Sequence, residues 1–305
     1  KTELQQALQK LSKATPARAT LPILGWGLVS VSEKRTTLKT TDLEITIQTE
    51  IPSSLEEEGT KALPLKTLLD ITNELPDARL TISVDDKNRA IIKTDLGEYD
   101  LMAKPADEFP ITPEQKNPKP ITVPGETLKE IIDSTAFAVS RDELKPALTG
   151  VFFQISPDGI IAVSTDGHKL VKHSRSDYQT KEISRDLIIP KKFLSYLSSH
   201  LTKKDIKLVL AENNLSVIMG GDTIITRIID ESFPNYQSVI PEENNKKLKI
   251  DKDLFLGAIR RVSIFSNKST HQVALSLSSG GCKITTEDPE KSSKAQETIT
   301  AEYEG

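Results

Sequence analysis

The sequence is poor in cysteine and has no long apolar run. Cys282 is the only cysteine among 305 residues, which excludes an intrachain disulfide and fits a reducing compartment. No apolar run approaches the roughly 20 residues that a membrane-spanning helix needs, and the chain does not open with a secretory signal pattern. We therefore expect a cytoplasmic protein without a membrane segment.

The motifs of common enzyme classes are also missing. The sequence contains no Gly-x-Ser-x-Gly nucleophile elbow, no Gly-x-x-x-x-Gly-Lys-Ser/Thr phosphate loop and no Gly-x-Gly-x-x-Gly nucleotide motif. The four histidines stand in different contexts, without a cysteine or paired carboxylates at metal-ligand spacing. We therefore predict a non-catalytic protein that needs no metal or other cofactor. A hydrolase that uses Asp166 and His168 remains the enzyme alternative.

A long internal repeat is the most informative feature that the sequence does have. Three sets of matching residues lie 124 positions apart: Leu24 and Leu148, Thr41-Asp42 and Thr165-Asp166, and Phe109-Pro110 and Phe233-Pro234. A period this long indicates duplicated domains, because the units of solenoid repeats are only about 20–50 residues long. Since the Thr-Asp pair occurs in both copies, we expect it to serve the fold. The Gly-His-Lys that follows in the second copy marks a candidate site.

Two kinds of local pattern recur within the copies. Apolar residues follow helical spacing at 4–11, 65–75, 128–139, 193–201 and 254–262. Strand-like alternation occurs in runs at 80–84, 90–94, 206–210, 215–219 and 223–229. Because helices and strands do not alternate strictly, the pattern favours α+β domains, each with two helices packed on antiparallel sheet.

Two polar segments, at 113–124 and 241–248, separate the copies. They predict domains at residues 1–119, 120–245 and 246–305. Two full copies leave room for only the first half of a third in a chain of 305 residues.

Basic residues follow the polar faces of several expected helices. The net charge of −4 does not by itself imply a nucleic-acid partner, which would need a basic surface separated from acidic ones. Five such helix-face residues are candidates for phosphate contact without base reading: Lys10, Lys13, Lys129, Arg260 and Arg261. The alternative is that each is ordinary solvated surface.

Several short strings together resemble the bacterial DNA polymerase III β subunit, the sliding clamp. They are TLPILG at 20–25, TTDLE at 40–44, PADEFP at 105–110, LTG at 148–150, STDGHKL at 164–170, DESFPNY at 230–236, SNK at 266–268 and KITT at 283–286. In this order they cover nearly the whole chain. Compared with the family, we expect the strand before the first helix and the second half of the third domain to be missing.

The resemblance implies tandem duplicated clamp domains that form half of a closed ring. Two subunits would join head to tail around double-stranded DNA, without sequence specificity, and tether the replicative polymerase. The clamp loader and other proteins with clamp-binding peptides would be further partners. The alternative outside this class is a tandem-repeat scaffold that binds only proteins.

The resemblance also assigns roles to particular residues. A peptide-binding groove between the second and third domains would be lined by Leu148, Thr165, Gly167, His168, Lys169, Leu170, Pro234 and Val239. Ser238 stands where the family often has arginine. Arg18, Arg141 and Lys145 would face the DNA. Tyr99, Leu101, Ile264 and Phe265 would form the apolar part of the dimer interface.

Overall fold

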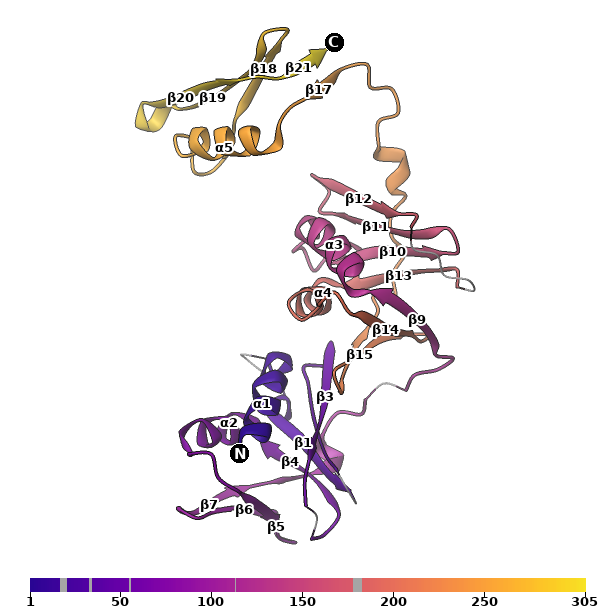
Figure 1. The fold of residues 1–305 in the computed structure, drawn as a ribbon, viewed down its shortest axis with the longest axis vertical. Coiled ribbons are helices and arrows are strands. Elements are labelled where there is room, and N and C mark those ends of the chain that lie inside the picture. Colours follow the sequence, from indigo (N-terminus) through magenta and orange to yellow (C-terminus); the bar gives the residue numbers. More distant parts are fainter. Residues whose placement is uncertain (17–20, 33–34, 55, 113, 178–182) are drawn as a thin grey trace. The chain divides into compact units, whose positions relative to one another are not determined.

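The computed structural model describes residues 1–305 except 17–20, 33–34, 55, 113 and 178–182 (Figure 1). The chain divides into two compact units, Lys1–Pro234 and Asn235–Gly305, and each is described by itself.

Four α-helices of the first unit lie where the apolar spacing of the sequence predicted helices. They are α1 (Thr2–Leu11), α2 (Leu65–Glu74), α3 (Gly125–Thr135) and α4 (Lys191–Ser198). The helices α2, α3 and α4 each follow a proline that ends a strand, where a missing backbone N–H costs no helical hydrogen bond. Within the described part of the chain, no helix has the length and apolar character that crossing a membrane requires.

The helix predicted over 128–139 ends earlier than its apolar pattern. The helix α3 stops at Thr135, and a 3-10 helix, η4 (Ala136–Ala138), continues the chain. The Thr135 hydroxyl donates to the Ile131 carbonyl at 2.7 Å, and the Thr135 carbonyl accepts the Ser164 hydroxyl at 2.6 Å. These two hydroxyl groups bond to backbone carbonyls in the last turn of α3. Because they compete there with the helical hydrogen bonds, the α-helix ends at this point.

One antiparallel sheet runs through most of the first unit. Its order is β8-β4-β1-β2-β3-β16-β15-β14-β9. The strands are β1 (Trp26–Ser32), β2 (Arg35–Thr41), β3 (Ile45–Pro52), β4 (Gly59–Pro64), β8 (Lys104–Pro105), β9 (Lys119–Pro124), β14 (Asp205–Leu210), β15 (Asn214–Met219) and β16 (Asp222–Arg227). The first repeat joins the second where β3 pairs with β16, with Ile47 opposite Ile224. This pairing explains why both repeats fall within a single compact unit.

Two smaller antiparallel sheets complete the first unit. One has the order β5-β6-β7 and contains β5 (Thr81–Val84), β6 (Arg89–Thr94) and β7 (Gly97–Met102). The other has the order β12-β11-β10-β13 and contains β10 (Gly150–Ser156), β11 (Gly159–Thr165), β12 (Leu170–Arg175) and β13 (Arg185–Pro190). Short 3-10 helices η1 (Ser12–Ala14) and η5 (Pro146–Leu148) follow α1 and precede β10.

The helices pack in pairs against these sheets. The helix α1 packs on α2 and β3, and α3 packs on α4 and β12. Their buried faces, with residues such as Leu8, Leu68, Ile131 and Phe193, belong to one hydrophobic core that extends through both repeats. The repeat pattern thus gives each copy two helices on antiparallel sheet, as the sequence predicted.

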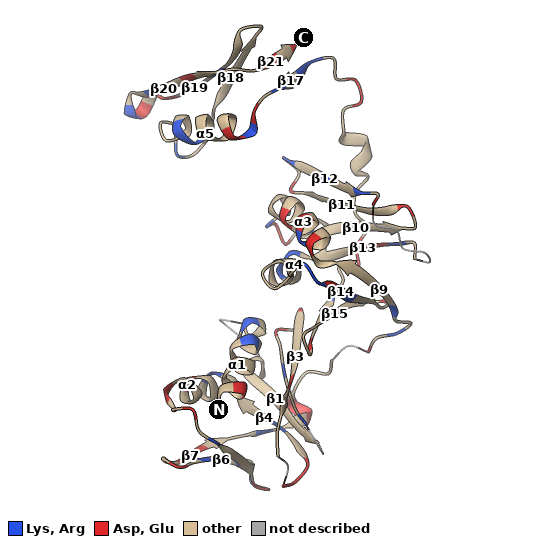
Figure 2. Ribbon diagram, in the orientation of Figure 1, with Lys and Arg blue, Asp and Glu red and all other residues tan. Residues whose placement is uncertain are grey.

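Ion pairs link the helices across the join between the two repeats. Lys10 on α1 contacts Asp222 on β16, with 2.8 Å between the ammonium nitrogen and the carboxylate oxygen. Lys192 on α4 pairs with Asp42, which follows β2 and has a side chain only 4% exposed. Figure 2 shows the basic residues of α1 and α4 on the same side of the sheet. Each repeat therefore contributes a cation to a carboxylate of the other.

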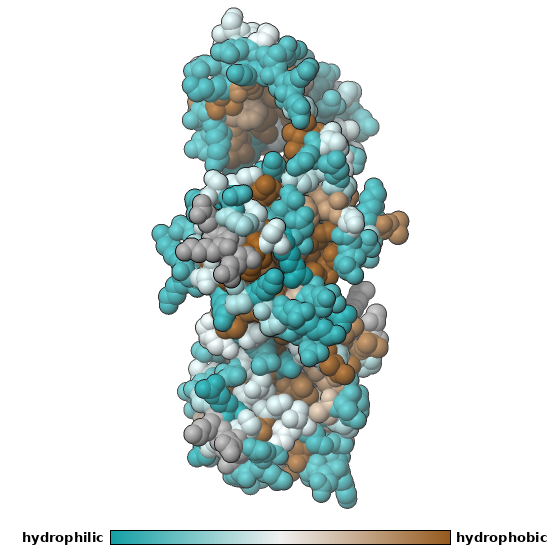
Figure 3. Space-filling model, turned by 90° about the vertical axis from the view of Figure 1, so that its right-hand side faces the viewer, coloured by the Kyte–Doolittle hydropathy of each residue, from teal (hydrophilic) through white to brown (hydrophobic). Residues whose placement is uncertain are grey.

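The second unit is a smaller layer of one helix on sheet. It contains α5 (Lys252–Ser263), the sheet β18 (Ala274–Ser278), β19 (Gly281–Asp288) and β20 (Ser293–Ile299), and the strand pair β17 (Lys247–Lys249) and β21 (Glu302–Glu304). Asp251 caps α5 by accepting the N–H groups of Asp253 and Leu254 at 3.0 and 2.9 Å. Figure 3 shows apolar side chains reaching the surface of this unit, in keeping with the exposure of Leu254 and Leu275.

The core position of α4 gives a direct stability test. Phe193 is fully buried, whereas Phe137 on η4 is 60% exposed. Phe193→Ala should lower the free energy of unfolding by about 3–5 kcal/mol, because it removes a buried ring and leaves a cavity. Phe137→Ala is the matched control and should change it by less than about 1 kcal/mol. Chemical denaturation measures both, and equal losses would contradict the burial of α4.

Candidate functional site

The turn between β11 and β12 is the most specific local feature of the first unit. The Thr165 hydroxyl donates to the Lys169 carbonyl at 2.7 Å and accepts the Gly167 N–H at 3.0 Å. The Asp166 carboxylate accepts the N–H groups of His168 and Lys169, each at 3.0 Å. Gly167 has a φ of +89°, which glycine adopts without a steric penalty. These bonds fix the turn while the side chains of His168 and Lys169 stay exposed.

The Asp166 carboxylate serves this turn. Its hydrogen bond with the Lys169 ammonium group, reinforced by the backbone N–H groups of Lys169 and His168, holds the pKa of Asp166 well below the usual range. The carboxylate therefore stays ionised near neutral pH, and its bond to His168 goes to the backbone. The turn accounts for the Asp-x-His spacing without an acid–base pair.

The first repeat contains the same turn. The Thr41 hydroxyl donates to the Ile45 carbonyl at 3.0 Å and accepts the Leu43 N–H at 3.1 Å. The Asp42 carboxylate accepts the N–H groups of Glu44 and Ile45 at 3.0 and 2.7 Å. Leu43 even takes the positive φ, +76°, that Gly167 takes in the second repeat. As the sequence led us to expect, the Thr-Asp pair builds the fold in both copies.

The two turns differ in what their aspartates contact. The Asp42 side chain is only 4% exposed and pairs with Lys192 of the second repeat, although Leu43 and Glu44 of the same turn are exposed. Asp166 pairs with Lys169 of its own turn, and its side chain is 21% exposed. The carboxylate of the second turn is therefore less covered than that of the first, and among the described residues it makes no ion pair with the other repeat.

Strand register brings several of the predicted groove residues to one end of a sheet. Phe152 of β10 lies opposite Val163 of β11, and Thr165 of β11 lies opposite Leu170 of β12. The start of β10, the end of β11 and the start of β12 are therefore at the same end of this sheet. Leu148 ends η5 directly before β10, and both Leu148 and Leu170 are half-buried. Each leucine can therefore offer apolar surface beside the turn.

The end of the first unit reaches the same sheet. The Phe233 ring stacks on the Phe152 ring, with 4.8 Å between the ring centroids and 5° between the planes. This stack holds the exposed Pro234 next to the sheet that carries the turn. Val239 belongs to the second unit, where its side chain is 66% exposed. Seven of the eight predicted groove residues thus belong to the first unit.

The structure describes two of the three loop residues that were predicted to face DNA. Arg18 lies outside the described residues. Arg141 and Lys145 are exposed in the loop between η4 and η5. Asp142 shapes this loop, because its carboxylate accepts the Leu144 N–H at 3.0 Å and its carbonyl accepts the Lys145 N–H at 3.1 Å.

The helix-face lysines of the first unit have internal partners. Lys10 pairs with Asp222, as described above. The Lys13 ammonium nitrogen lies 3.0 Å from Nε2 of His200 and 5.9 Å from the centre of the Tyr196 ring. Burial raises the pKa of Tyr196 to about 12, so this ring remains a neutral phenol.

The polar face of α3 is more acidic than the helix-face pattern suggested. Lys129 is accompanied there by Glu126, Glu130 and Asp133. The Lys129 ammonium group pairs with Asp133 at 3.0 Å and donates to the carbonyl and hydroxyl of Ser198 at 3.1 and 3.0 Å. The pairing with Asp133 follows from the i, i+4 spacing along α3, whereas the contact with Ser198 of α4 could not be seen in the sequence.

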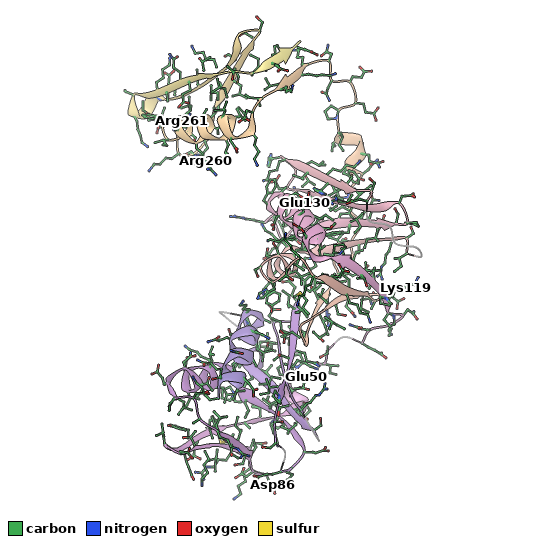
Figure 4. The ribbon with its side chains drawn as sticks, in the orientation of Figure 1. Glu50, Asp86, Lys119, Glu130, Arg260 and Arg261 are labelled. Carbon is green, nitrogen blue, oxygen red and sulfur yellow. The ribbon has the colours of Figure 1, made fainter. Side chains whose placement is uncertain are left out.

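The two arginines of α5 also differ from each other (Figure 4). Arg261 forms a bidentate pair with Glu297 of β20, with nitrogen–oxygen distances of 2.8 and 2.7 Å. This hydrogen-bonded pair lowers the pKa of Glu297. Arg260 is exposed, and no carboxylate pairs with it among the residues that the structure describes.

Comparison with known proteins identifies the family. Domain descriptions of the DNA polymerase III beta subunit match in order: the N-terminal domain over residues 1–113, the central domain over 122–235 and the C-terminal domain over 237–305. The beta sliding clamp of Pseudomonas putida is 30% identical over 309 residues, which cover 99% of this chain and 83% of the relative. The chain belongs to the DNA polymerase III β-subunit family, the sliding clamps.

Solved clamp structures share the fold. The sliding clamp of Bacillus subtilis is 27% identical with a TM-score of 0.92, and the match covers 100% of this chain and 83% of that one. A Pseudomonas aeruginosa clamp bound to griselimycin is also 27% identical, with a TM-score of 0.89 and the same coverage. The predicted α+β clamp fold and the prediction of a non-catalytic clamp subunit are confirmed.

The residues predicted for the clamp's dimer interface lie on an edge strand and at a helix end. Tyr99 and Leu101 are on β7, the edge of its sheet, and their side chains pack partly against the core. Ile264 and Phe265 follow α5 and are 77% and 45% exposed. Met102, on the opposite face of β7 from Tyr99 and Leu101, is 59% exposed.

The conformation of Gly167 can be tested by substitution. An added Cβ would have free space at Gly167 and at Gly97, but only Gly167 has a positive φ. Gly167→Ala should therefore lower the free energy of unfolding by about 1–2 kcal/mol, since an L-residue is strained there. Gly97→Ala is the control and should be neutral or slightly stabilising. If chemical denaturation gave equal effects, the turn geometry would be wrong.

Proposed function

We propose that two copies of this chain close into a ring that encircles duplex DNA and tethers the replicative polymerase to it. The observation that carries this proposal is the match to beta sliding clamps along 99% of the chain. The clamp loader and other proteins with clamp-binding peptides are the further partners. The clamp acts in the cytoplasm, where the DNA is.

The charge of the chain is suited to topological retention. A closed ring holds DNA without binding it tightly, and many strong phosphate contacts would slow sliding. The chain has a net charge of −4, with basic residues on particular helices and loops. Such a distribution attracts the DNA phosphates weakly at those helices and loops. We propose domain limits of 1–119, 120–245 and 246–305 from the polar segments of the sequence; in the structure the second compact unit already begins at Asn235.

The open turn of the second repeat is the proposed peptide site. Leu148, Leu170, Pro234 and Val239 supply apolar surface for an extended peptide. Thr165, Gly167, His168 and Lys169 supply polar groups at its edge. An apolar floor with a few polar groups is the usual composition of such a site. The exposure of Gly167, His168 and Lys169 beside the half-buried Leu148 and Leu170 supports the assignment.

The DNA-facing surface is proposed to include the loop of Arg141 and Lys145, together with Arg18. The basic residues on α1, η1, α3 and α5 add to it: Lys10, Lys13, Lys129, Arg260 and Arg261. Tyr99, Leu101, Ile264 and Phe265 are proposed to close the ring. The free edge of β7 and the exposure of Ile264 support this role.

Retention on circular DNA tests the proposed function directly. The protein is loaded onto nicked circular duplex DNA, and the circle is then cut once. A topological clamp stays on the circle and leaves through the ends of the linear product. Persistence on linear DNA would indicate a conventional DNA-binding protein, and no retention on the circle would indicate a scaffold that binds only proteins.

A charge at Leu170 tests the peptide site. Leu170→Asp should abolish binding of a clamp-binding peptide, because the carboxylate would lose its water at a cost of several kcal/mol when the peptide docks. Leu144→Asp is the matched control, since Leu144 is 90% exposed in a neighbouring loop. Calorimetry measures the affinity, and thermal unfolding reports stability. Unchanged affinity with a lower melting temperature would make Leu170 a core residue only.

Neutralising the proposed DNA-facing loops tests the channel. Arg18→Gln, Arg141→Gln and Lys145→Gln together should weaken loading and retention without changing sequence preference. The salt slope is the steepness with which the logarithm of the binding constant falls as the logarithm of the salt concentration rises. Each direct phosphate contact that is lost should reduce this slope by roughly 0.9. The control triple, Lys87→Gln, Lys119→Gln and Lys207→Gln, removes equal charge from exposed positions outside the helices. If both triples kept the parent's salt dependence, these loops would lie outside the channel.

A further inference from the structure

The basic side chains of the proposed DNA-facing surface fall into two groups. In the described ranges, no carboxylate pairs with the first group, which comprises Lys13, Arg141, Lys145 and Arg260. The second group is held by carboxylates and comprises Lys10, Lys129 and Arg261. A count of basic residues therefore overstates the charge that DNA meets.

Lys129 shows the second group most clearly. Its ammonium group lies 3.0 Å from the Asp133 carboxylate, one helical turn further along α3. The carbonyl and hydroxyl of Ser198 on α4 hold the same ammonium group. Asp133 also accepts the Ser198 hydroxyl, which helps keep the pKa of this carboxyl low. Lysine and carboxylate are both about half exposed, so a phosphate could reach the lysine only in competition with Asp133.

The same arrangement occurs on two other helices. Lys10 of α1 meets Asp222, which is 16% exposed and also accepts the Thr49 hydroxyl. In the second unit, Arg261 of α5 is held by both oxygens of Glu297. These carboxylates come from three different elements: the helix itself, β16 and β20. In three separate places along the chain, therefore, a carboxylate lies beside a basic side chain of a helix.

We propose that Asp133, Asp222 and Glu297 are positioning residues that keep the clamp mobile on DNA, because each holds a basic helix side chain that phosphate could otherwise bind. This inference rests on the proposed encirclement of DNA. A phosphate that takes one of these cations must displace a carboxylate, so little free energy is gained at each step along the duplex. The unpaired group then supplies the attraction that centres the DNA.

Asp133→Asn is the sharpest test. Asparagine keeps the shape of the side chain, and Ser198 still holds Lys129 in place. The freed ammonium group should make the salt slope steeper by roughly 0.9, which is the change expected for one added phosphate contact. Diffusion of the loaded clamp along duplex DNA should become slower. Glu297→Gln should act in the same direction through Arg261.

Matched variants separate this effect from a change in overall charge. Asp86→Asn removes one negative charge from the exposed β5–β6 hairpin and should leave slope and diffusion unchanged (Figure 4). Asp133→Asn combined with Lys129→Gln should return to the parent's slope. Lys129→Gln alone should lower the slope less than Lys145→Gln, because Lys129 is already paired.

The salt slope and the diffusion constant of the full chain on nicked circular DNA decide the matter. The inference is supported if Asp133→Asn steepens the slope and the double variant reverses it. It is overturned if Asp133→Asn matches the parent, or if Asp86→Asn has the same effect as Asp133→Asn. If the parent protein itself is not retained on circles or not released from linear DNA, the proposed function fails first, and the inference fails with it.

Discussion

The hydrogen-bonded pairing of β3 with β16 is the constraint on which the first unit depends. Two duplicated domains joined only by a polar linker would be free to move against each other. Here the pairing of residues 45–48 with 223–226 merges their sheets into one sheet of nine strands. Since backbone hydrogen bonds fix both spacing and direction, the helices of the two repeats keep a constant relation.

The duplicated turn has different surroundings in the two repeats. In the first repeat, Lys192 covers Asp42, and β16 runs beside the strand that follows the turn. In the second repeat, Asp166 finds its cation within the turn itself. The same backbone geometry therefore carries an ion pair between the repeats in one copy, and we propose that it serves peptide recognition in the other. What separates the two is the neighbouring element and not the Thr-Asp pair.

The fold could largely be predicted from the sequence, because its signals are local. Apolar spacing located α1, α2, α4 and α5, and the period of 124 residues located the duplication. The early end of α3 depends on the Ser164 hydroxyl, which is distant in sequence. The contacts of Lys10 with Asp222 and of Lys129 with Ser198 come from side-chain placement in three dimensions, whereas Asp133 lies four residues after Lys129 on the same helix. Apart from that spacing, the sequence identified candidate cations but could not tell which of them are already neutralised.

Amide hydrogen exchange across the β3–β16 pairing tests the account most directly. If the first two domains share one sheet, the amides of residues 45–48 and 223–226 that bond across the pairing exchange as slowly as those of β2 and β15. The free edge of β5, at the other side of the β5-β6-β7 sheet, supplies the fast-exchanging reference within the same protein. Exchange across the pairing as fast as at β5 would mean a mobile hinge, and would contradict a fixed relation between the helices of the two repeats.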